Sequence, residues 1–206
     1  MGRTPGLGGD DMSDKAARKK QLILDTAKKV FAEKGFKDVT MKDIVEACKI
    51  SRGGLYIYFE NTEQILEEII EHEATQRDDV FSRSRKDCTA GDILAIFLKE
   101  QKKELLSTKD NLSVAIYEYL FWKHSRNESC KREQDRFSSA VEVLTHLIEN
   151  GVENGEFYSD DPEGAARNIM YVIEGLKIAS GTYGITSQDI DNELLYIMSG
   201  LLAGDE

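Results

Sequence analysis

Apolar residues recur every three or four positions through most of the chain, which is the spacing of one face of an α-helix. Ile23, Ala27 and Val30 follow this spacing near the start, and Ile169 and Ile173 follow it near the end. Only two prolines interrupt the pattern, and no segment reads convincingly as a strand. We therefore predict an all-α fold of about nine helices, at residues 15–34, 41–48, 52–58, from 62 past 72, 90–106, 111–124, 128–150, 162–182 and 188–203.

Several of these helices have residues at their predicted ends that satisfy free backbone groups. N-terminal caps are expected at Thr40, Ser51, Thr62, Thr89 and Asp110. Asp43 follows Thr40 by three residues and completes a carboxylate form of the capping box. Gly35 ends the first helix, and Pro162 suits the first turn of the eighth. The predicted boundaries therefore depend on capping chemistry as well as on periodicity.

The first residues differ from the rest of the chain. Residues 1–14 include a glycine-rich, aperiodic stretch, so we expect them to be disordered. Met12 is a candidate natural start, with the residues before it added for expression. What remains divides into a small head at 15–61 and a larger helical domain at 62–206.

Charge is distributed unevenly between these two parts. The chain carries 27 basic and 38 acidic residues, a formal charge of −11, which by itself disfavours a nucleic-acid partner. Between residues 15 and 59, however, eleven lysines and arginines against five acids give +6, while in residues 60–206 fifteen against thirty give −15. A short basic head on an acidic body fits contact with DNA through the head alone.

The second and third predicted helices are short and joined by a tight turn, as in a helix-turn-helix, whose second helix enters the major groove. Arg52 opens that helix and can bridge O6 and N7 of a guanine. Gly53 and Gly54 let the backbone approach the DNA closely. Lys42 and Lys49 can add attraction to phosphates of any sequence. The spacing alone is a weak signal, since many helical proteins contain such pairs.

Three runs of sequence carry a family resemblance: GFKDVTMKDIV at 35–45, SRGGLYIYF at 51–59 and EQIL at 63–66. Together they resemble the N-terminal domain of TetR/AcrR-family transcriptional regulators over about residues 18–72, because the glycine, caps, apolar core and Leu-Tyr-x-Tyr-Phe segment occur in family order. The remaining two thirds resembles the family only in length and helical organisation. The resemblance implies a homodimer that binds a palindromic double-stranded DNA operator.

The resemblance also assigns roles in DNA contact. Arg52, Gly53 and Tyr56 would face the major groove, while Thr40 and Tyr58 would contact phosphates. The expected DNA-binding set is Thr40, Lys42, Lys49, Ser51, Arg52, Gly53, Gly54, Tyr56, Tyr58 and Thr62.

Plainer interpretations of the same residues stay open. Tyr56 and Tyr58 could be partly buried aromatics, and Arg52 could be a surface residue that pairs with Glu46. Thr62 stands where the family often has lysine, which leaves the threonine and the helix N-terminus to attract that phosphate.

The last two helices form a dimeric four-helix bundle in the family, and the sequence agrees with that arrangement. They carry apolar stripes over more than one face, together with small residues that permit close approach of helices. A twofold partner would cover the second stripe; alternatively, the stripes only seal the core of one chain. The expected interface is Ala165, Ile169, Val172, Leu176, Ala179, Leu194, Ile197 and Leu201.

A ligand pocket is the other feature that the family implies for this region. The aromatic-rich segment at 111–124 and the penultimate helix could enclose a small hydrophobic or cationic organic ligand, held by cation–π and ion-pair contacts. The alternative is that the aromatic residues fill the core or an interface and the acids are solvated. The candidates are Tyr117, Glu118, Phe121, Trp122, Tyr171 and Glu174.

These features predict a sequence-specific DNA-binding regulator, a repressor released from its operator by a ligand. The alternatives are a DNA-binding regulator without a small-molecule ligand and an all-α enzyme, although no catalytic motif is visible. The histidines and cysteines are isolated, so we expect no metal and no cofactor. The odd set of three cysteines, the absence of an apolar run of ~20 residues and the lack of a visible signal peptide predict a cytoplasmic protein without membrane contact.

Overall fold

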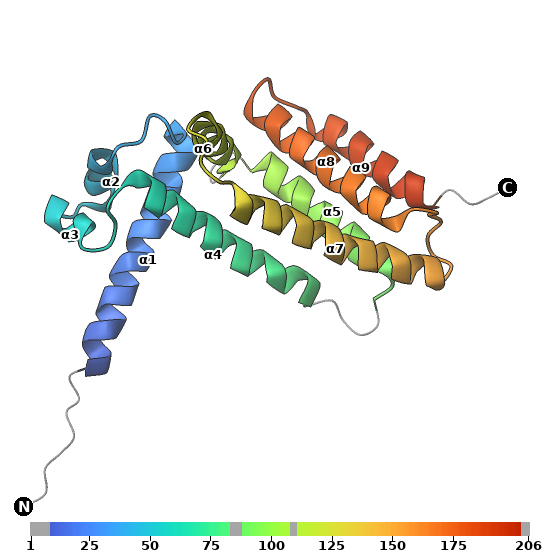
Figure 1. The fold of residues 1–206 in the computed structure, drawn as a ribbon, viewed down its shortest axis with the longest axis horizontal. Helices are drawn as coiled ribbons and strands as arrows, with labels where there is room; N and C mark the ends of the chain where they lie inside the picture. The colour runs from blue at the N-terminus through green and yellow to red at the C-terminus, as the bar shows by residue number, and fades with distance from the viewer. Residues whose placement is uncertain (1–8, 83–87, 108–110, 203–206) are drawn as a thin grey trace, which may run out of the picture.

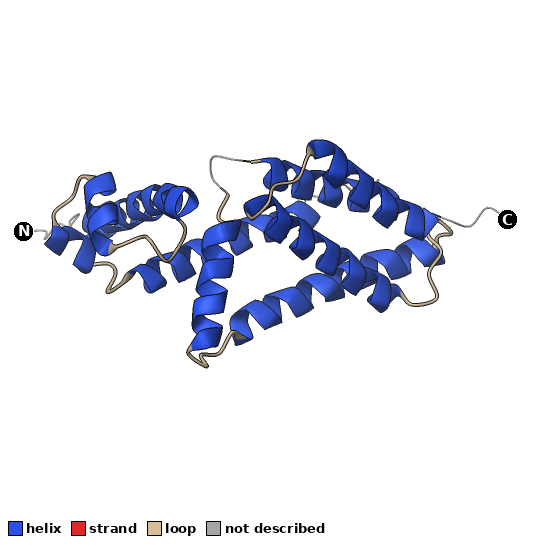
Figure 2. Cartoon of the chain, turned by 90° about the horizontal axis from the view of Figure 1, so that it is seen from above, coloured by secondary structure: helices blue, strands red, loops and turns tan. Residues whose placement is uncertain are grey.

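The computed structural model describes residues 9–82, 88–107 and 111–202, with side chains described for 14–74 and throughout the other two ranges. The described part consists of helices and loops (Figure 2). A head formed by the first helices lies at one end and a bundle of long helices at the other (Figure 1). This confirms the all-α prediction. The helices of the described ranges are α1 Gly9–Lys34, α2 Met41–Cys48, α3 Arg52–Tyr56, α4 Thr62–Ser82, α5 Ala90–Leu106, α6 Ser113–Ser125, α7 Lys131–Glu153, α8 Pro162–Gly181 and α9 Ser187–Leu202.

Predicted capping residues open α2 and α3. At the start of α2, the Asp43 amide donates to Thr40 Oγ1 at 3.3 Å and the Thr40 amide donates to Asp43 Oδ2 at 2.8 Å, which completes the capping box. At the start of α3, the Gly54 amide donates to Ser51 Oγ at 3.1 Å. Gly35 ends α1 with a φ of +77°, a left-handed conformation that glycine adopts without strain. Local chemistry thus fixes the turns that lead from α1 to α3.

The start of α4 differs from the prediction, because Thr62 is the first residue of the helix and not its cap. The Gln64 amide donates to Asn61 Oδ1 at 2.8 Å, and the Gln64 side-chain oxygen accepts from the Glu60 amide at 2.8 Å. Asn61 therefore caps α4. Asparagine and threonine are both good caps, so two neighbouring candidates cannot be ranked by residue type alone.

Two more helix boundaries of the head differ from their predicted positions. α1 begins at Gly9, so residues 9–14 are helical where disorder was expected, and residues 1–8 lie outside the described ranges. α3 ends at Tyr56, two residues before the predicted end. α3 is therefore little more than one turn long, so its position depends on how it is anchored to the head core.

The start of α6 also depends on a different residue from the one predicted. The amide of Ser113, the first residue of α6, donates to Asn111 Oδ1 at 2.8 Å. The predicted cap, Asp110, lies outside the described residues. The N-cap position itself is taken by Leu112, which makes no side-chain cap.

α7 continues past residue 150, where a break was expected, because Gly151 lies inside the helix. A Cβ atom at Gly151 would stand 2.1 Å from Phe157 Cδ2, so the Phe157 ring packs directly on the glycine. The Phe157 amide donates to the Gly151 carbonyl at 3.1 Å. The glycine therefore serves close packing, and the chain leaves the helix after Glu153.

Two clusters of buried residues hold the molecule together. The body core joins α5, α7, α8 and α9 and includes Leu94 and Ile173. The head core joins α1, α2, α3 and α4, and it also includes Ala115 and Tyr119 from α6. α6 lies between the head and the bundle (Figure 1) and contacts both α1 and α8. The predicted domain boundary at residue 61 therefore does not separate two cores, because residues of α4 and α6 beyond it pack in the head core.

Among the described helices, none combines the length and the apolar character that a membrane span requires. The described residues likewise contain no group of three or more His, Cys, Asp and Glu side chains that could hold a metal ion. Cys48, Cys88 and Cys130 are free thiols.

Candidate nucleic-acid interface

α3 presents a narrow outer face formed by Arg52, Gly53 and Tyr56, all of which are exposed. Its inner side is anchored in the head core by Leu55, which is 0% exposed, and the following turn is anchored by Phe59, which is 1% exposed. A Cβ atom at Gly53 would meet no atom within 4 Å, so the backbone here is open to an approaching partner. This is the geometry that a recognition helix needs in the major groove.

Arg52 and Tyr56 form a cation–π pair on this face. The Arg52 guanidinium lies 5.4 Å from the centroid of the Tyr56 ring. Glu46, the alternative surface partner of Arg52, pairs with Lys42 at 3.7 Å. A cation–π contact does not use the N–H donors of the guanidinium as a hydrogen bond would, so they can still donate to a base edge.

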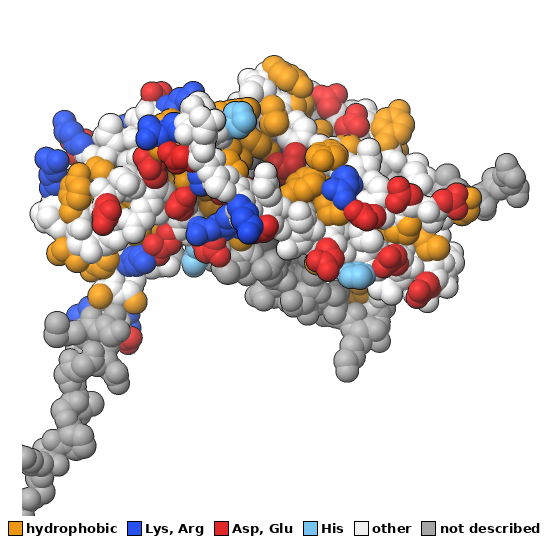
Figure 3. Space-filling view, viewed as in Figure 1, with side chains coloured by type: hydrophobic (Ala, Val, Ile, Leu, Met, Phe, Trp, Pro, Cys, Tyr) orange, Lys and Arg blue, Asp and Glu red, His pale blue; other side chains and the backbone are white. Residues whose placement is uncertain are grey.

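Basic side chains surround the α2–α3 turn. Lys42 has a side chain that is 83% exposed. Lys49 is the C-cap residue that follows α2; it has a φ of 54°, and its amide donates to the Glu46 carbonyl. Lysine and arginine side chains gather over the α2–α3 end of the head, whereas acidic side chains dominate the far end of the body (Figure 3). The uneven charge of the sequence is therefore present on the surface.

α1 contributes one further cation to the edge of this face. Lys19 Nζ lies 6.0 Å from the centroid of the half-buried Tyr58 ring. The same ammonium would stand 3.6 Å from a Cβ atom at Gly54. The sequence indicates Lys19 only as one of several basic residues before the first apolar stripe, because its proximity to α3 depends on how α1 packs.

Ile57 is a surface residue for which the sequence gives no signal. It follows α3 directly and is 78% exposed, although isoleucine is usually buried. It occupies the variable position of the Leu-Tyr-x-Tyr-Phe segment. An exposed apolar side chain beside a recognition helix can contact the methyl group of a thymine.

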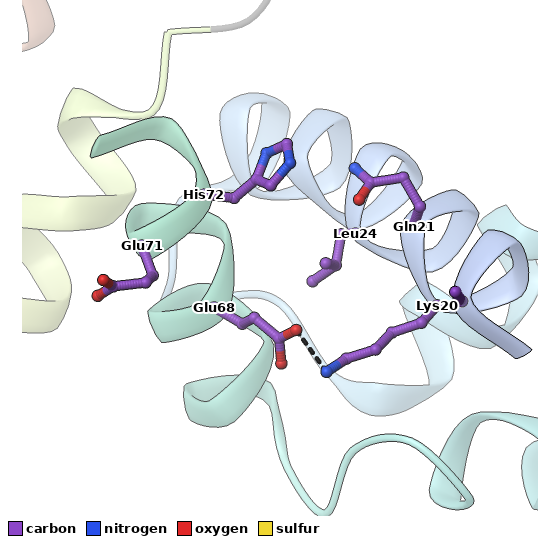
Figure 4. Close-up of a pocket in the computed structure, with 7 residues that line it drawn as sticks. Lys20, Gln21, Leu24, Glu68, Glu71 and His72 are labelled. Carbon is purple, nitrogen blue, oxygen red and sulfur yellow. Dashed lines mark ion pairs between the residues drawn. The ribbon is translucent and has the colours of Figure 1, made fainter. Parts of the chain in front are cut away.

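A cleft of about 380 Å³ lies between α1 and α4 and is lined by both helices (Figure 4). Lys20 pairs with Glu68 at 2.5 Å, and Lys28 pairs with Glu73 at 2.9 Å. These ion pairs join the two helices and match two of the basic charges of the head with acids. The charge that is directed at phosphates is therefore smaller than the +6 of the segment.

Tyr117 and Glu174 are brought together between α6 and α8, as the ligand hypothesis requires. The Tyr117 hydroxyl donates to Glu174 Oε2 at 2.5 Å, and Lys177 donates to Glu174 Oε1 at 2.8 Å. Burial and then the hydrogen bond to Glu174 raise the pKa of Tyr117, which stays protonated. The Glu174 carboxylate thus already has a cation and a hydroxyl as partners.

The aromatic candidates for the ligand pocket do not gather around this pair. Trp122 packs in the head, with its ring centroid 5.6 Å from that of Phe36. Tyr171 contacts Phe137 on α7, with ring centroids 5.2 Å apart. Phe121 is 66% exposed. These three rings therefore do not form a cage around the Tyr117–Glu174 pair, because Trp122 and Tyr171 pack on other partners and Phe121 is exposed.

Glu118 contacts the head and not Glu174. Its Oε2 atom accepts hydrogen bonds from the amides of Phe36 and Lys37 at 2.7 and 3.1 Å. This contact joins positions about 80 residues apart in the chain, so no local pattern could reveal it. The sequence-based role of Glu118 as a pocket residue is thus replaced by a role at the junction with the head.

Most residues expected at the dimer interface are core residues of one chain. Ala165 and Val172 are half-buried against the same core. A partner cannot bury side chains that are already covered, so the expected interface is corrected to the body core. The buried positions, all of which except Ala179 belong to the body core, are Ile169, Leu176, Ala179, Leu194, Ile197 and Leu201.

An all-α chain with a basic helix-turn-helix head, an exposed recognition helix and a separate helical body has the architecture of a DNA-binding transcriptional regulator. The model for bacterial regulatory proteins of the tetR family matches residues 23–69, and the model for the tetracyclin repressor-like C-terminal domain matches residues 93–191. The chain belongs to the TetR family and is a DNA-binding transcriptional regulator.

Individual relatives agree with this assignment. The HTH-type transcriptional regulator YfiR of Bacillus subtilis is 30% identical over 171 residues, which cover 77% of this chain and 83% of YfiR. The HTH-type transcriptional repressor KstR2 of Rhodococcus jostii is 29% identical over 73% of each chain. A transcriptional regulator from Saccharomonospora viridis, solved in complex with choline, shares the fold with a TM-score of 0.77, at 19% identity over 91% of this chain and 100% of that chain.

Proposed function

We propose that a homodimer of this chain binds a palindromic operator through α3, acts as a repressor, and is released by a small organic ligand. The observation that carries the DNA-binding part is the outer face of α3, where Arg52 and Tyr56 flank the open side of Gly53 over a buried anchor. In a dimer, two such faces read half-sites about 34–36 Å apart, or a multiple of that distance.

In this proposal, different residues contact the bases and the phosphates of the DNA. Arg52 donates to a guanine, Tyr56 contacts a neighbouring base, and Gly53 admits the backbone to the groove. Ser51 and Gly54 act indirectly, because the Ser51 hydroxyl and the Gly54 amide are bonded to each other in the cap of α3. Phosphates are contacted by Thr40, Lys42, Lys49, Tyr58 and the α4 N-terminus at Thr62.

The dimer face is the outer side of α8 and α9. Gly175 and Gly200 share that outer side, and a Cβ atom at either would meet nothing within 4 Å. Small residues beside large exposed apolar ones allow two helix pairs to approach closely and bury the patch. The exposed apolar residues of the two helices are Tyr171, Ile178, Leu195, Tyr196 and Leu202.

The ligand site is placed where α6 meets α8, at Tyr117 and Glu174. A cationic or hydrogen-bonding organic ligand would take the place of Tyr117 or Lys177, both of which contact the Glu174 carboxylate in the free protein. The choline complex of a protein with the same fold supports a cationic group, and the apolar character of the surrounding helices supports a hydrophobic one. Release from DNA requires that the ligand bind the DNA-incompetent conformation more tightly.

Selection of fragments of the source genome by the purified protein tests the DNA-binding part. We expect enrichment of a palindromic site whose affinity falls steeply as salt is raised. Arg52→Ala should weaken binding by roughly 10- to 100-fold and relax the preference at one base pair. The matched control is Arg167→Ala on α8, which should bind like the wild type. Full-strength operator binding by Arg52→Ala would sink the assignment of α3.

Thermal shift with choline and with a medium-chain fatty acid tests the ligand part. A cation that binds at Glu174 should raise the melting temperature of the wild type and have no effect on Glu174→Gln. A fatty acid should act on both proteins alike. If neither compound shifts melting and native mass spectrometry finds no copurified molecule, a regulator without a small-molecule ligand is favoured instead.

A further inference from the structure

Three consecutive residues of α6 hold three different parts of the molecule. Tyr117 donates to Glu174 on α8 at 2.5 Å, and Tyr119 donates to Glu67 on α4. Glu118, between them, accepts from the turn that follows α1. Because α6 lies between the head and the bundle (Figure 1), these side chains join the two parts directly.

The turn at residues 35–37 is shaped around the Glu118 carboxylate. One oxygen, Oε2, accepts from two successive amides, Phe36 at 2.7 Å and Lys37 at 3.1 Å. A Cβ atom at Gly35 would stand 2.5 Å from the same oxygen, and Gly35 has a φ of +77°. Any residue with a side chain at position 35 would therefore be strained and would also displace the carboxylate.

Aromatic packing holds the same turn from a second side. The Phe36 ring meets Tyr119 and Trp122 edge-on, with centroid distances of 5.0 and 5.6 Å. The chain then passes through Thr40 into α2 and on to α3. Whatever fixes residues 35–37 on α6 therefore also fixes where the recognition helix points.

We propose that Glu118 is a positioning residue that sets the orientation of the head on the body, and with it the spacing of the two recognition helices in the dimer. This rests on the proposed function, since it needs a dimer that reads paired half-sites. On the body side, Tyr117 ties α6 to α8, the helix that carries part of the proposed dimer face. α6 is thus a short mechanical link from the dimer face to the α1–α2 turn.

Substitutions of Glu118 alter this link in defined ways. Glu118→Ala removes the acceptor. Glu118→Asp keeps the charge but shortens the side chain by one methylene, so its oxygen reaches the two amides only if the turn moves. Glu118→Gln keeps an acceptor oxygen at the same reach. Glu142, exposed on α7, supplies the matched control as Glu142→Ala.

The test uses duplexes that the wild-type protein selects from a random library, with the spacer between half-sites changed by one or two base pairs. Each added base pair moves a half-site by about 3.4 Å and turns it by about 34°. For the wild type and Glu142→Ala we expect one preferred spacer, with a loss of roughly tenfold or more at the neighbouring lengths.

For Glu118→Ala and Glu118→Asp, we expect the loss of affinity at the neighbouring spacer lengths to be less than about threefold, or the preferred spacer length to change. Glu118→Gln should keep the spacer preference of the wild type. A variant that is merely less stable would bind less at every length with the same preference.

An unchanged spacer preference in folded Glu118→Ala and Glu118→Asp overturns the proposal, and Glu118→Asp decides if Glu118→Ala does not fold. Failure of the proposed function would give another result, because the wild type would then select no duplex with paired half-sites.

Discussion

Gly53 lies in a helix and its outer side is open. A substitution there should therefore affect stability and DNA binding in opposite directions. A methyl group there would meet no atom of the chain within 4 Å, and alanine favours helix more than glycine does. We expect Gly53→Ala to raise the free energy of unfolding by about 0.5 kcal/mol. Operator binding should weaken roughly tenfold, since the methyl would stand between α3 and the groove.

Urea unfolding and a DNA titration on the same preparation measure both effects. Unchanged operator affinity in the Gly53→Ala protein would mean that DNA does not approach α3 at this residue.

Asp43 at the start of α2 links stability to pH. The hydrogen bond from Lys34 and then those from Thr40 hold the pKa of Asp43 well below its usual range. A carboxyl whose pKa is lowered by folding stabilises the folded state above its unfolded value of about 3.9. That contribution is lost as the pH falls through the lowered value, so it is present at neutral pH and fades in acid.

Asp43→Asn should therefore lower the melting temperature at about pH 7 and flatten the loss of stability that the wild type shows between about pH 4 and pH 2. Thermal unfolding followed by circular dichroism across this range measures the difference. Asp38→Asn, in the exposed turn before Thr40, is the control and should follow the wild-type profile. An Asp43→Asn profile parallel to that of the wild type would contradict the assignment.

At the scale of single residues, predictability depends on where the partner lies. Thr40 and Asp43 are three residues apart, so their capping box can be predicted from the sequence and is present. Glu118 and Phe36 are 82 residues apart, and a carboxylate that binds a distant turn has the same local pattern as a solvated one. The outer face of α3 could be predicted from the family resemblance, and the glycines at 53 and 54, which are unusual inside a helix, agree with it.

At the scale of helices, boundaries that depend on local capping could be predicted, whereas those that depend on tertiary packing could not. α2, α5 and α8 begin at their predicted residues, because each cap and its first turn lie within four positions. The end of α7 was predicted too early, because a glycine can either end a helix or leave space for a side chain that packs against the helix. The position of the Phe157 ring shows that Gly151 makes room for a neighbouring side chain, and that position depends on tertiary packing.

Gly151→Ala tests this account of α7. The added methyl would overlap the Phe157 ring, so we expect the free energy of unfolding to fall by about 1–3 kcal/mol, although alanine favours helix. Urea unfolding measures the change, with Gly53→Ala as the helical control whose methyl meets open space. A more stable Gly151→Ala protein would show that the ring can move aside at little cost.

At the scale of the whole molecule, α8 and α9 present apolar side chains that a single chain leaves uncovered. Tyr196 and Leu195 on α9 are 73% and 64% exposed. In the proposed dimer, Tyr196→Glu would place a carboxylate in the buried interface, so we expect dissociation to monomers at micromolar protein. Sedimentation velocity measures the change. Val143→Glu, at an exposed apolar position of α7, is the control and should remain dimeric.

α6 completes the head core while it also contacts α8 of the bundle, and this limits how such regulators can be recombined. A chimera that takes residues up to the end of α4 from one relative and the rest from another would separate Ala115 and Tyr119 from the head core that they complete. The transplanted head would then meet a foreign α6 whose side chains were selected against different neighbours. We expect functional exchange of heads, in the laboratory or in evolution, only where α6 travels with the head or already matches it.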